Sequence, residues 1–253
     1  ASPLDFAYAI HTEVGHQCVG ARVNGKMVPL RYKLKNGDIV EILTAAGHNP
    51  SRDWLTLAVT NKARAKIRHY LNVAEKQAAL EIGKKHFERE LKRALSHVKR
   101  YGTQAALMFV DLDGFKGIND RYGHGAGDAL LKAVARELIG NVRASDIVGR
   151  IGGDEFGLLL TGCPLEKARQ IADDVVRAVG DHRFVWKDKI FNIGVSVGLV
   201  ELSRESGSLE DVISAADSAC YVAKQQGGHV HVYSARDEAV ARSRGEIHWL
   251  QQL

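Results

Sequence analysis

Two short acidic segments of this sequence combine residue types that could bind a divalent cation beside a phosphate. In RIGGDEFGLLL, residues 150–160, Asp154 and Glu155 follow two glycines and precede an apolar run. In MFVDLDGFKGIND, residues 108–120, Asp111 stands where another apolar run ends. Alone, the first segment also fits a Gly-Gly hairpin turn whose acids merely face water. The rest of the sequence has to decide between chemistry and an ordinary turn.

The chemistry depends on whether these carboxylates come together. Strand alternation puts Asp111 and Asp113 on one face and Leu112 on the other. If this strand lies beside the glycine hairpin, Asp111 comes near Asp154 and Glu155, and the ionised carboxylates repel one another. A divalent cation removes the repulsion, and oxygen ligands with room for phosphate oxygens suit Mg²⁺. Because adjacent glycines let the backbone approach a phosphate, the segments predict metal-assisted phosphoryl or nucleotidyl transfer.

Periodic patterns divide the 253 residues into four predicted regions. Near the start, apolar runs flank Asn24-Gly25, which is a strong hairpin signal. A helical period follows, with Ser51 as a candidate cap and Gly83 as either an interruption or a residue tolerated at a cost of about 1 kcal/mol. The regions are a strand-rich module (1–46), a helical connector (47–98), a domain of alternating strands and helices (99–234) and a C-terminal helical connector (235–253).

The alternating region predicts the fold class, which is α+β (α/β) with helices packed on a mixed sheet. Its expected strands are AALMFVDLD, IVGRIG, FGLLLTG, FVWKD, KIFNIGVSVGLVEL and HVHVY. Its expected helices are HGAGDALLKAVARELIG, PLEKARQIADDVVRAVG and LEDVISAADSACYVAKQQ. The two acidic segments fall at the ends of strands in this pattern, where side chains from neighbouring strands can meet.

Composition places the chain among ordinary globular proteins. Apolar residues make up 45% and charged residues 26% of it. No apolar run approaches the roughly 18 residues that a membrane span needs, and the first residues lack a secretory signal pattern. The 3 cysteines are widely spaced without a CxxC pair, so we expect reduced thiols, a cytoplasmic location and no membrane segment.

The net charge of +5 is unevenly spread, with basic runs at residues 61–71 and 83–100. Such runs attract phosphate-bearing partners. The second run also fits a solvated helix face, because Glu88 and Glu90 stand at helical spacing from lysines and arginines. The first run contains fewer acids and leaves both interpretations open.

The acidic segments belong to a longer series of motifs. DLDGFKGIND, YGHGAGDALL, IVGRIGGDEF, NIGVSVG and AADSACYVAK follow one another in the order found in the GGDEF diguanylate cyclase family. About residues 87–233 therefore resemble that family, whose fold is related to polymerase-palm and nucleotidyl-cyclase domains. The resemblance implies condensation of two GTP into cyclic di-GMP with release of pyrophosphate, in a homodimer whose domains each hold one GTP.

The resemblance also implies roles for individual residues. The catalytic candidates are Asp154 and Glu155, with Asp154 as the base for the attacking 3′-hydroxyl. The implied ligands of Mg²⁺ (or Mn²⁺) are Asp111, the carbonyl of Leu112, Asp154 and Glu155. The implied substrate-binding residues are Asn119 and Asp128 at the guanine, and Gly114, Phe115, Lys116 and Lys224 at the phosphates.

Upstream of the glycine hairpin, Arg143 and Asp146 match the RxxD product-inhibition site of the same family. There the arginine binds the guanine and phosphate of cyclic di-GMP and the aspartate assists. The alternative is a surface Arg–Asp pair worth at most about 1 kcal/mol.

Two departures from the family pattern predict reduced activity. Gly228 stands where the family has an arginine that contacts the triphosphate. The usual Leu-Thr-Gly-Leu opening is also absent, and EKQAALEIGKK occupies its place. A non-catalytic module that binds GTP or cyclic di-GMP is therefore the alternative to a cyclase.

The first part of the chain resembles a different family. DFAYAIHTEVGHQCVGARVNGKMVPLRYKLKNGDIVEILT resembles the small β-grasp-like TGS domain of RelA/SpoT stringent-response enzymes, and the match with the helices that follow extends to about residue 80. The resemblance implies a regulatory module with a tRNA or protein partner. His11 is then a candidate contact for the 3′ end of uncharged tRNA, or else a helix-end histidine without a ligand. An RNA-contacting stringent-response fragment is thus a further alternative function.

The last residues resemble a third element. VHVYSARDEAVARSRGEIHWLQQL is similar to the connector that leads into an EAL phosphodiesterase domain. The sequence therefore combines parts of two families, without the alarmone synthetase and hydrolase segments of the first and without the EAL segment of the second.

We expect Gly228→Arg to tighten GTP binding, because a hydrogen bond to a charged group contributes on the order of 1.5–3 kcal/mol. The dissociation constant for GTP, measured by isothermal titration calorimetry, should fall about tenfold or more. An unchanged affinity would contradict the alignment of this glycine with the family's arginine.

Overall fold

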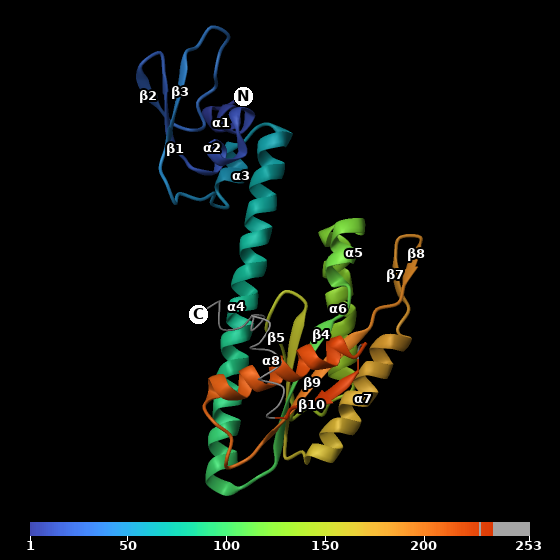
Figure 1. The fold of residues 1–253 in the computed structure, drawn as a ribbon. Helices are drawn as coiled ribbons and strands as arrows, with labels where there is room; N and C mark the ends of the chain where they lie inside the picture. The colour runs from blue at the N-terminus through green and yellow to red at the C-terminus, as the bar shows by residue number, and fades with distance from the viewer. Residues whose placement is uncertain (228, 235–253) are drawn as a thin grey trace. The chain divides into compact units, whose positions relative to one another are not determined.

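The computed structural model describes residues 1–227 and 229–234 (Figure 1). The chain divides into two compact units, Ala1–Ala79 and Leu80–Leu253, and each is described here by itself. The expectations for Gly228, the C-terminal helical connector and its EAL resemblance lie outside the described residues. Within the described ranges, no helix has both the length and the apolar character needed to cross a membrane.

The first unit combines short helices with a three-stranded antiparallel sheet of order β2-β1-β3. Asn24 and Gly25 both have positive φ, as a tight two-residue hairpin turn requires, so the hairpin predicted there is confirmed. The elements in chain order are α1 (Pro3–Ile10), α2 (Thr12–His16), β1 (Cys18–Val23), β2 (Lys26–Val28), β3 (Val40–Thr44), α3 (Trp54–Leu57) and the beginning of α4 (Asn61–Tyr101).

In the predicted helical region, the cap expected at Ser51 is wrong, and the open question of whether Gly83 interrupts the helix is settled. Ser51 does not cap a helix: α3 begins at Trp54, and the Ser51 carbonyl accepts a turn hydrogen bond from the Trp54 N–H. Gly83 does not interrupt the second helix, because α4 continues through it to Tyr101. The segment expected as a connector, residues 47–98, thus contains α3 and most of α4.

A buried carboxylate organises the first unit. Asp5 is only 3% exposed, and it accepts hydrogen bonds from the Ser2 N–H at 2.7 Å and from the Thr60 N–H and hydroxyl, each at 2.9 Å. It therefore closes the capping box of α1 and also holds the backbone just before α4. Burial alone would raise the pKa of Asp5, but the hydrogen bonds from Ser2 and Thr60 outweigh it and lower the pKa.

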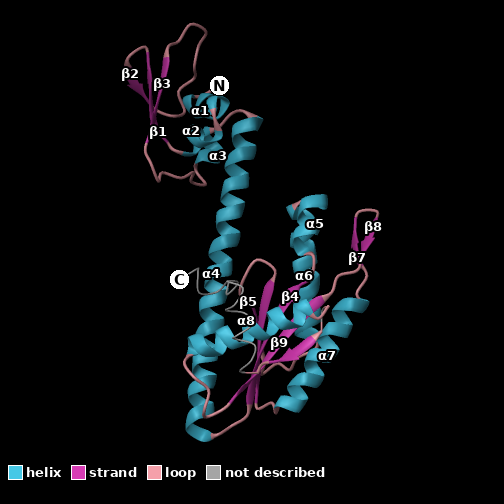
Figure 2. Cartoon of the chain, viewed as in Figure 1, coloured by secondary structure: helices cyan, strands magenta, loops and turns pink. Residues whose placement is uncertain are grey.

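The second unit is built on a five-stranded mixed sheet of order β10-β9-β4-β6-β5 (Figure 2). Only the β10–β9 pair is parallel among the strands described, so the predicted mixed sheet is confirmed. The strands are β4 (Ala105–Leu112), β5 (Ile147–Arg150), β6 (Glu155–Thr161), β9 (Val195–Leu202) and β10 (Val230–Val232). The helices are the end of α4, α5 (Phe115–Tyr122), α6 (His124–Gly140), α7 (Leu165–Asp181) and α8 (Leu209–Gln225).

Strand β4 is buried on both faces, which explains its continuous apolar sequence. Its even-numbered residues, such as Met108, pack with α6 and α7. Its odd-numbered residues, such as Leu107, pack with α4 and α8 on the other face. Figure 1 shows these helix pairs on opposite sides of the sheet. Both cores therefore fix the position of the strand that ends at Asp111 and Leu112.

One expected strand is divided in the structure. KIFNIGVSVGLVEL forms β8 (Lys189–Phe191), which pairs with β7 (Phe184–Trp186), and then the separate strand β9. The short helix α5 was not predicted, because the polar, glycine-containing segment after Asp113 carries no clear apolar period.

The β5–β6 hairpin receives an aromatic ring from α4. Gly149 and Gly157 are cross-strand partners, and the ring of Phe87 lies over both of them. A Cβ atom at position 157 would come within 2.5 Å of that ring. Since Phe87 is only 2% exposed, this contact is part of the core and fixes α4 against the hairpin.

We expect Asp5→Asn to destabilise the first unit by about 2–4 kcal/mol, because the variant leaves buried donors of Ser2 and Thr60 without a full set of acceptors. Urea unfolding of the full chain, followed by tryptophan fluorescence, measures the loss. Asp53→Asn changes an exposed acid without a capping hydrogen bond and should have little effect.

The Asp5 contribution should also depend on pH. Its folded-state pKa is depressed below 3.8, so the stabilisation is fully present above the unfolded value and is lost as the pH falls through the folded value. The stability difference between the wild type and Asp5→Asn should therefore shrink only in strong acid. A difference that shrinks near neutral pH would contradict this origin.

Candidate active site

The sheet register brings the two acidic segments together. Strands β4 and β6 are antiparallel, with Asp111 directly opposite Glu155. One residue further, the Leu112 N–H donates to the Asp154 carbonyl at 3.2 Å. The end of one strand and the tip of the neighbouring hairpin therefore meet, and the predicted juxtaposition of Asp111, Asp154 and Glu155 is present.

The space around the β5–β6 turn explains why glycines occupy positions 152 and 153. A Cβ atom on Gly152 would lie 2.1 Å from Glu155 Oε2, so a side chain at this position would displace that carboxylate. Gly153 has open space where a Cβ would stand. The first glycine therefore makes room for Glu155, whereas the second leaves the tip of the turn uncovered for a ligand to approach.

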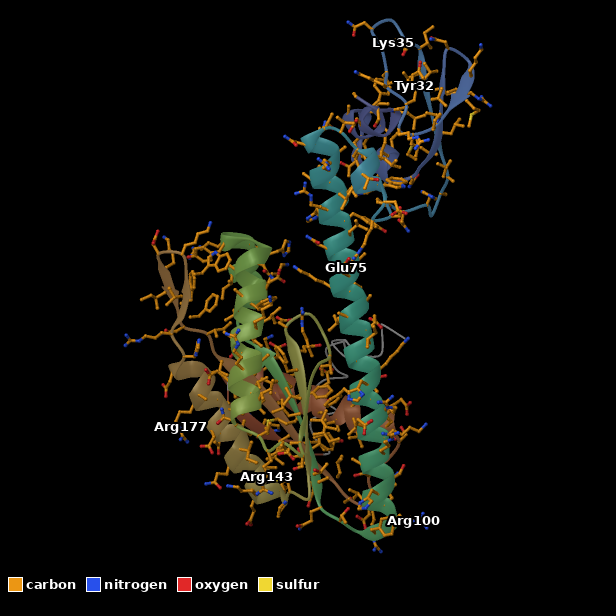
Figure 3. The ribbon with its side chains drawn as sticks, turned by 180° about the vertical axis from the view of Figure 1, so that it is seen from behind. Tyr32, Lys35, Glu75, Arg100, Arg143 and Arg177 are labelled. Atoms are coloured by element: carbon orange, nitrogen blue, oxygen red, sulfur yellow. The ribbon has the colours of Figure 1, made fainter. Side chains whose placement is uncertain are left out.

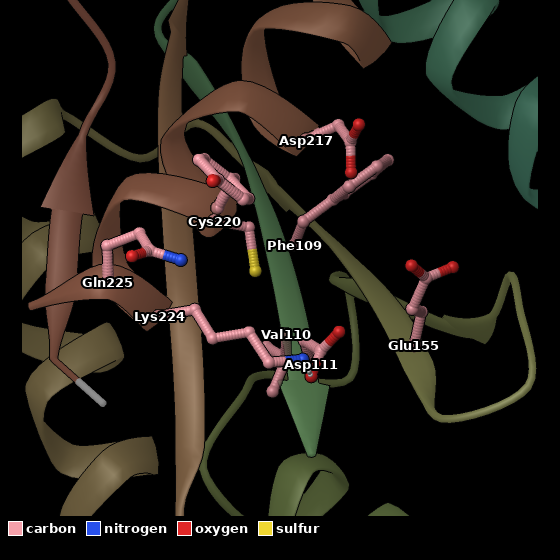
Figure 4. Close-up of a pocket in the computed structure, with 9 residues that line it drawn as sticks. Phe109, Val110, Asp111, Glu155, Asp217, Cys220, Lys224 and Gln225 are labelled. Carbon is pink, nitrogen blue, oxygen red and sulfur yellow. Dashed lines mark hydrogen bonds and ion pairs between the residues drawn. The ribbon is translucent and has the colours of Figure 1, made fainter. Parts of the chain in front are cut away.

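A cavity of about 410 Å³ opens beside the strand end (Figure 4). Asp111, Glu155, Asp217 and Lys224 contribute its charged groups. Burial, followed by the charges of Asp217, Asp111 and Asp154, raises the pKa of Glu155 to about 7. The site is therefore an accumulation of carboxylates with a single lysine among the charged residues that line this cavity.

Lys224 already neutralises one of the candidate metal ligands. Its Nζ donates to Asp111 Oδ1 at 2.7 Å, and the Asp111 side chain is only 17% exposed. Burial raises the pKa of Asp111, and the lysine opposes that rise. Burial would lower the pKa of Lys224, but Asp111 outweighs it and raises the pKa. The ammonium group thus binds one oxygen of a carboxylate that is a candidate metal ligand.

The donor set fits Mg²⁺ in its chemistry. Carboxylates and a strand-end carbonyl are hard oxygen ligands, and a cation would relieve the repulsion that raises the pKa of Glu155. Among the described residues, however, no group of three or more acidic, histidine or cysteine side chains is already arranged to hold a metal ion. Lys224 holds one oxygen of Asp111, so a metal ion would compete with the ammonium for that carboxylate or share it.

The start of α5 provides backbone donors next to the acids. Gly114 has a φ of +74°, which glycine adopts without strain, and it precedes the helix without any side-chain capping bond. The N–H groups of the first turn therefore remain available for an anion. Lys116 is exposed on this turn, whereas Phe115 is buried in the core.

The two candidate guanine-binding residues come from neighbouring helices. Asn119 lies on α5, and Asp128 lies in the first turns of α6. A Cβ on Gly127 would be 2.0 Å from Asn119 Oδ1, so the missing side chain at position 127 allows Asn119 to lie against α6. The structure therefore brings this pair together.

The remaining predicted residues lie elsewhere. Arg143 is exposed (Figure 3) and Asp146 ends the same loop before β5, at the opposite end of that strand from the glycine turn. The Asp146 carboxylate accepts from the backbone N–H groups of Arg143 and Thr161, at 3.0 and 3.2 Å. In the first unit, exposed His11 accepts from the Glu13 N–H and caps α2.

Sequence reasoning missed two residues at the site. Asp217 lines the cavity, and its spacing of seven residues before Lys224 would have placed it two helical turns away on the same face. Arg150 precedes the glycines, and its guanidinium donates to the Gly152 and Gly153 carbonyls. No periodic pattern indicates that contact, because it depends on the closed turn.

Comparison with known families places both halves of the chain. The family described as "Diguanylate cyclase, GGDEF domain" matches residues 82–229, and the TGS domain family matches residues 1–44. Both resemblances inferred from the sequence are thereby confirmed.

Curated relatives match different parts of the chain. The probable diguanylate cyclase DgcE of Escherichia coli is 41% identical over 162 residues, which are 64% of this chain and 15% of DgcE. A GTP pyrophosphokinase of Myxococcus xanthus is 54% identical over 93 residues, which are 37% of this chain and 12% of that enzyme. This chain therefore spans only a small part of either relative.

Solved structures agree with the fold of the second unit. The GGDEF domain of YfiN (TpbB) from Pseudomonas aeruginosa has a TM-score of 0.56 at 34% identity and covers 60% of this chain and 95% of its own. The GGDEF domain of DgcB from Caulobacter crescentus, solved with cyclic di-GMP, has a TM-score of 0.56 at 27% identity, covering 59% and 89%. With a family match over more than half of its length, the chain belongs to the GGDEF diguanylate cyclase domain family.

Proposed function

We propose that this protein is a diguanylate cyclase, which condenses two GTP molecules into cyclic di-GMP and two pyrophosphates in a Mg²⁺-dependent reaction. The observation that carries the proposal is the β4–β6 register, which sets Asp111 opposite Glu155 beside the exposed turn of Asp154. Membership of the GGDEF family supports the choice of substrate.

Each proposed substrate contact has a counterpart in the chain. The backbone N–H groups at the start of α5 and the ammonium of Lys116 would bind the phosphates. Asn119 and Asp128 would recognise the guanine, since an aspartate that accepts from N1–H and N2–H rejects adenine by leaving polar groups unpaired. Lys224 would exchange Asp111 for a phosphate oxygen when GTP enters.

Asp154 is the proposed base for the chemical step. It would accept the proton of a ribose 3′-hydroxyl while that oxygen attacks the α-phosphorus of the second GTP, and pyrophosphate leaves. Mg²⁺, held by Asp111, the Leu112 carbonyl, Asp154 and Glu155, would neutralise charge on the transferring phosphoryl group. Because the product needs two such bonds, two domains with one GTP each would face each other in a symmetric homodimer.

Two regulatory elements belong to the same proposal. Arg143 and Asp146 would bind cyclic di-GMP as product-inhibition residues, and the exposure of Arg143 supports this. Residues 1–46 would act as a regulatory module, joined through residues 47–98 to the cyclase, residues 99–234. The basic run at the start of α4 supports a phosphate-bearing partner such as tRNA for the first unit. The glycine at position 228 supports a weakened rather than a full activity.

We expect Asp154→Ala to reduce formation of cyclic di-GMP by about 10²–10⁴-fold, the range that a general base contributes. The purified 253-residue chain is incubated with GTP and Mg²⁺, and the product is quantified by liquid chromatography. Asp188→Ala, in the β7–β8 turn, is the matched control and should retain activity. Wild-type protein that binds GTP without any turnover would sink the enzyme and favour a nucleotide receptor.

We expect Lys224→Met to bind Mn²⁺ on the order of tenfold more tightly than the wild type in the absence of nucleotide, because the variant frees Asp111 from a charge-assisted hydrogen bond. Its affinity for GTP should fall. Mn²⁺ binding is measured by electron paramagnetic resonance and GTP binding by calorimetry.

Lys116→Met provides the comparison for this prediction. Lys116 is exposed on α5 and would also contact phosphates, so its loss should weaken GTP binding without tightening Mn²⁺ binding. Equal Mn²⁺ affinities for Lys224→Met and the wild type would contradict the competition at Asp111.

A further inference from the structure

Arg150 holds the glycine turn that carries the proposed base. It is the last residue of β5 and is half-buried. Its Nε donates to the Gly152 carbonyl at 3.1 Å and to the Gly153 carbonyl at 3.2 Å. Its Nη2 donates to the Gly153 carbonyl at 2.7 Å. One guanidinium therefore binds two consecutive carbonyls of the turn.

The turn needs such a support because its sequence gives it little rigidity. Two adjacent glycines have more backbone freedom than any other pair of residues. Within the loop, the N–H groups of Ile151 and Gly152 both donate to the Glu155 carbonyl, at 3.0 and 3.3 Å. The carbonyls of Gly152 and Gly153 accept hydrogen bonds from Nε and Nη2 of Arg150. The guanidinium thus completes the hydrogen bonding of the loop.

Arg150 also interacts electrostatically with two acids from different elements. Burial lowers the pKa of its guanidinium, and the charges of Asp128 and Asp154 act in the opposite direction, so both carboxylates are near enough to interact with it. Asp128 belongs to α6 and is the proposed guanine contact, whereas Asp154 belongs to the turn. The same guanidinium therefore interacts with the residue that would recognise the base and with the residue that would take the proton.

We propose that Arg150 is a positioning residue of the active site: its forked guanidinium fixes the Gly152–Gly153 turn, and with it the location of Asp154 relative to Asp128. The consequence for catalysis rests on the proposed cyclase function. The consequence for the turn itself does not, because the hydrogen bonds are present without any ligand.

Arg150 binds the two carbonyls through the rigid, planar arrangement of Nε and Nη2. The lysine ammonium keeps the charge but presents its donors from one point on a flexible stem, so Arg150→Lys loses the planar geometry. Glutamine is shorter and uncharged, so it also removes the positive charge of Arg150 that interacts with Asp128 and Asp154. Arg150→Lys and Arg150→Gln therefore separate the role of the charge from that of the fork. Arg169→Gln, at an exposed position on α7, is the control.

The first measurement is amide hydrogen exchange of the ligand-free 253-residue chain. Both Arg150 variants should exchange the amides of residues 151–155 at least about tenfold faster than the wild type, because the loss of the carbonyl bonds favours local opening. The exchange rates of the β4 amides should be unchanged in both variants. Arg169→Gln should exchange the amides of residues 151–155 at the wild-type rate. Unaltered exchange at residues 151–155 in Arg150→Gln overturns the proposal, whether or not the protein makes cyclic di-GMP.

The second measurement is the kinetics of cyclic di-GMP synthesis. A displaced base costs on the order of 100-fold in rate, so kcat should fall by that amount in both variants while KM for GTP changes less than about threefold. A merely structural role would instead lower the active fraction and the melting temperature, leaving the kcat per folded protein intact. Faster exchange with an unchanged kcat overturns the positioning role.

Chemical rescue gives the third readout. In Arg150→Ala, millimolar ethylguanidinium should slow the exchange of residues 151–155 back towards the wild-type rate and restore part of kcat, whereas ethylammonium should do neither. Equal effects of the two cations overturn the requirement for the fork. If the wild-type protein shows no turnover, the proposed cyclase function is contradicted. The hydrogen-exchange result then still tests whether Arg150 fixes the turn.

Discussion

Opposing two carboxylates on neighbouring strands is electrostatically unfavourable, and the second unit is organised around this one constraint. Like charges directly across an antiparallel pair destabilise a sheet, yet Asp111 and Glu155 stand in that relation. The register cannot relax, because a slip of one residue would turn every core side chain of β4 to the wrong face. Burial on both faces of the strand therefore imposes the repulsion on the site.

The cost of that repulsion is met within the chain by α8. Lys224 of α8 donates to Asp111. The position of this lysine is set by the close approach of α8 to β9. A Cβ on Gly198 would lie 2.2 Å from the Cys220 backbone nitrogen, so helix and strand touch where glycine leaves room. Lys224 lies one turn beyond Cys220 on α8 and is delivered by this contact. A packing detail of the core thus determines the charge balance of the pocket.

Local sequence patterns predicted the elements well where periodicity was strong. Helix α6 has the bounds expected, and the strands on either side of the glycine turn are present. The acidic site was also predictable, because strand ends and a hairpin tip are local features. Asp217 was missed although its seven-residue spacing from Lys224 predicts a shared helix face, and Arg150 was missed because its role arises only when the turn closes. Ser51 failed as a cap because residues 51–53 form a turn before the short helix α3.

The ring of Phe87, which packs on Gly149 and Gly157, couples the position of the β5–β6 hairpin to that of α4. At its centre the hairpin presents no side chains of its own towards α4, so its cover there is a single aromatic ring from that helix. A shift of the helix by one residue rise, about 1.5 Å, would either open a void above Gly149 and Gly157 or carry both strands along. Because close-packed interiors resist voids, we expect a displacement of this part of α4 along its axis to carry the acidic hairpin with it.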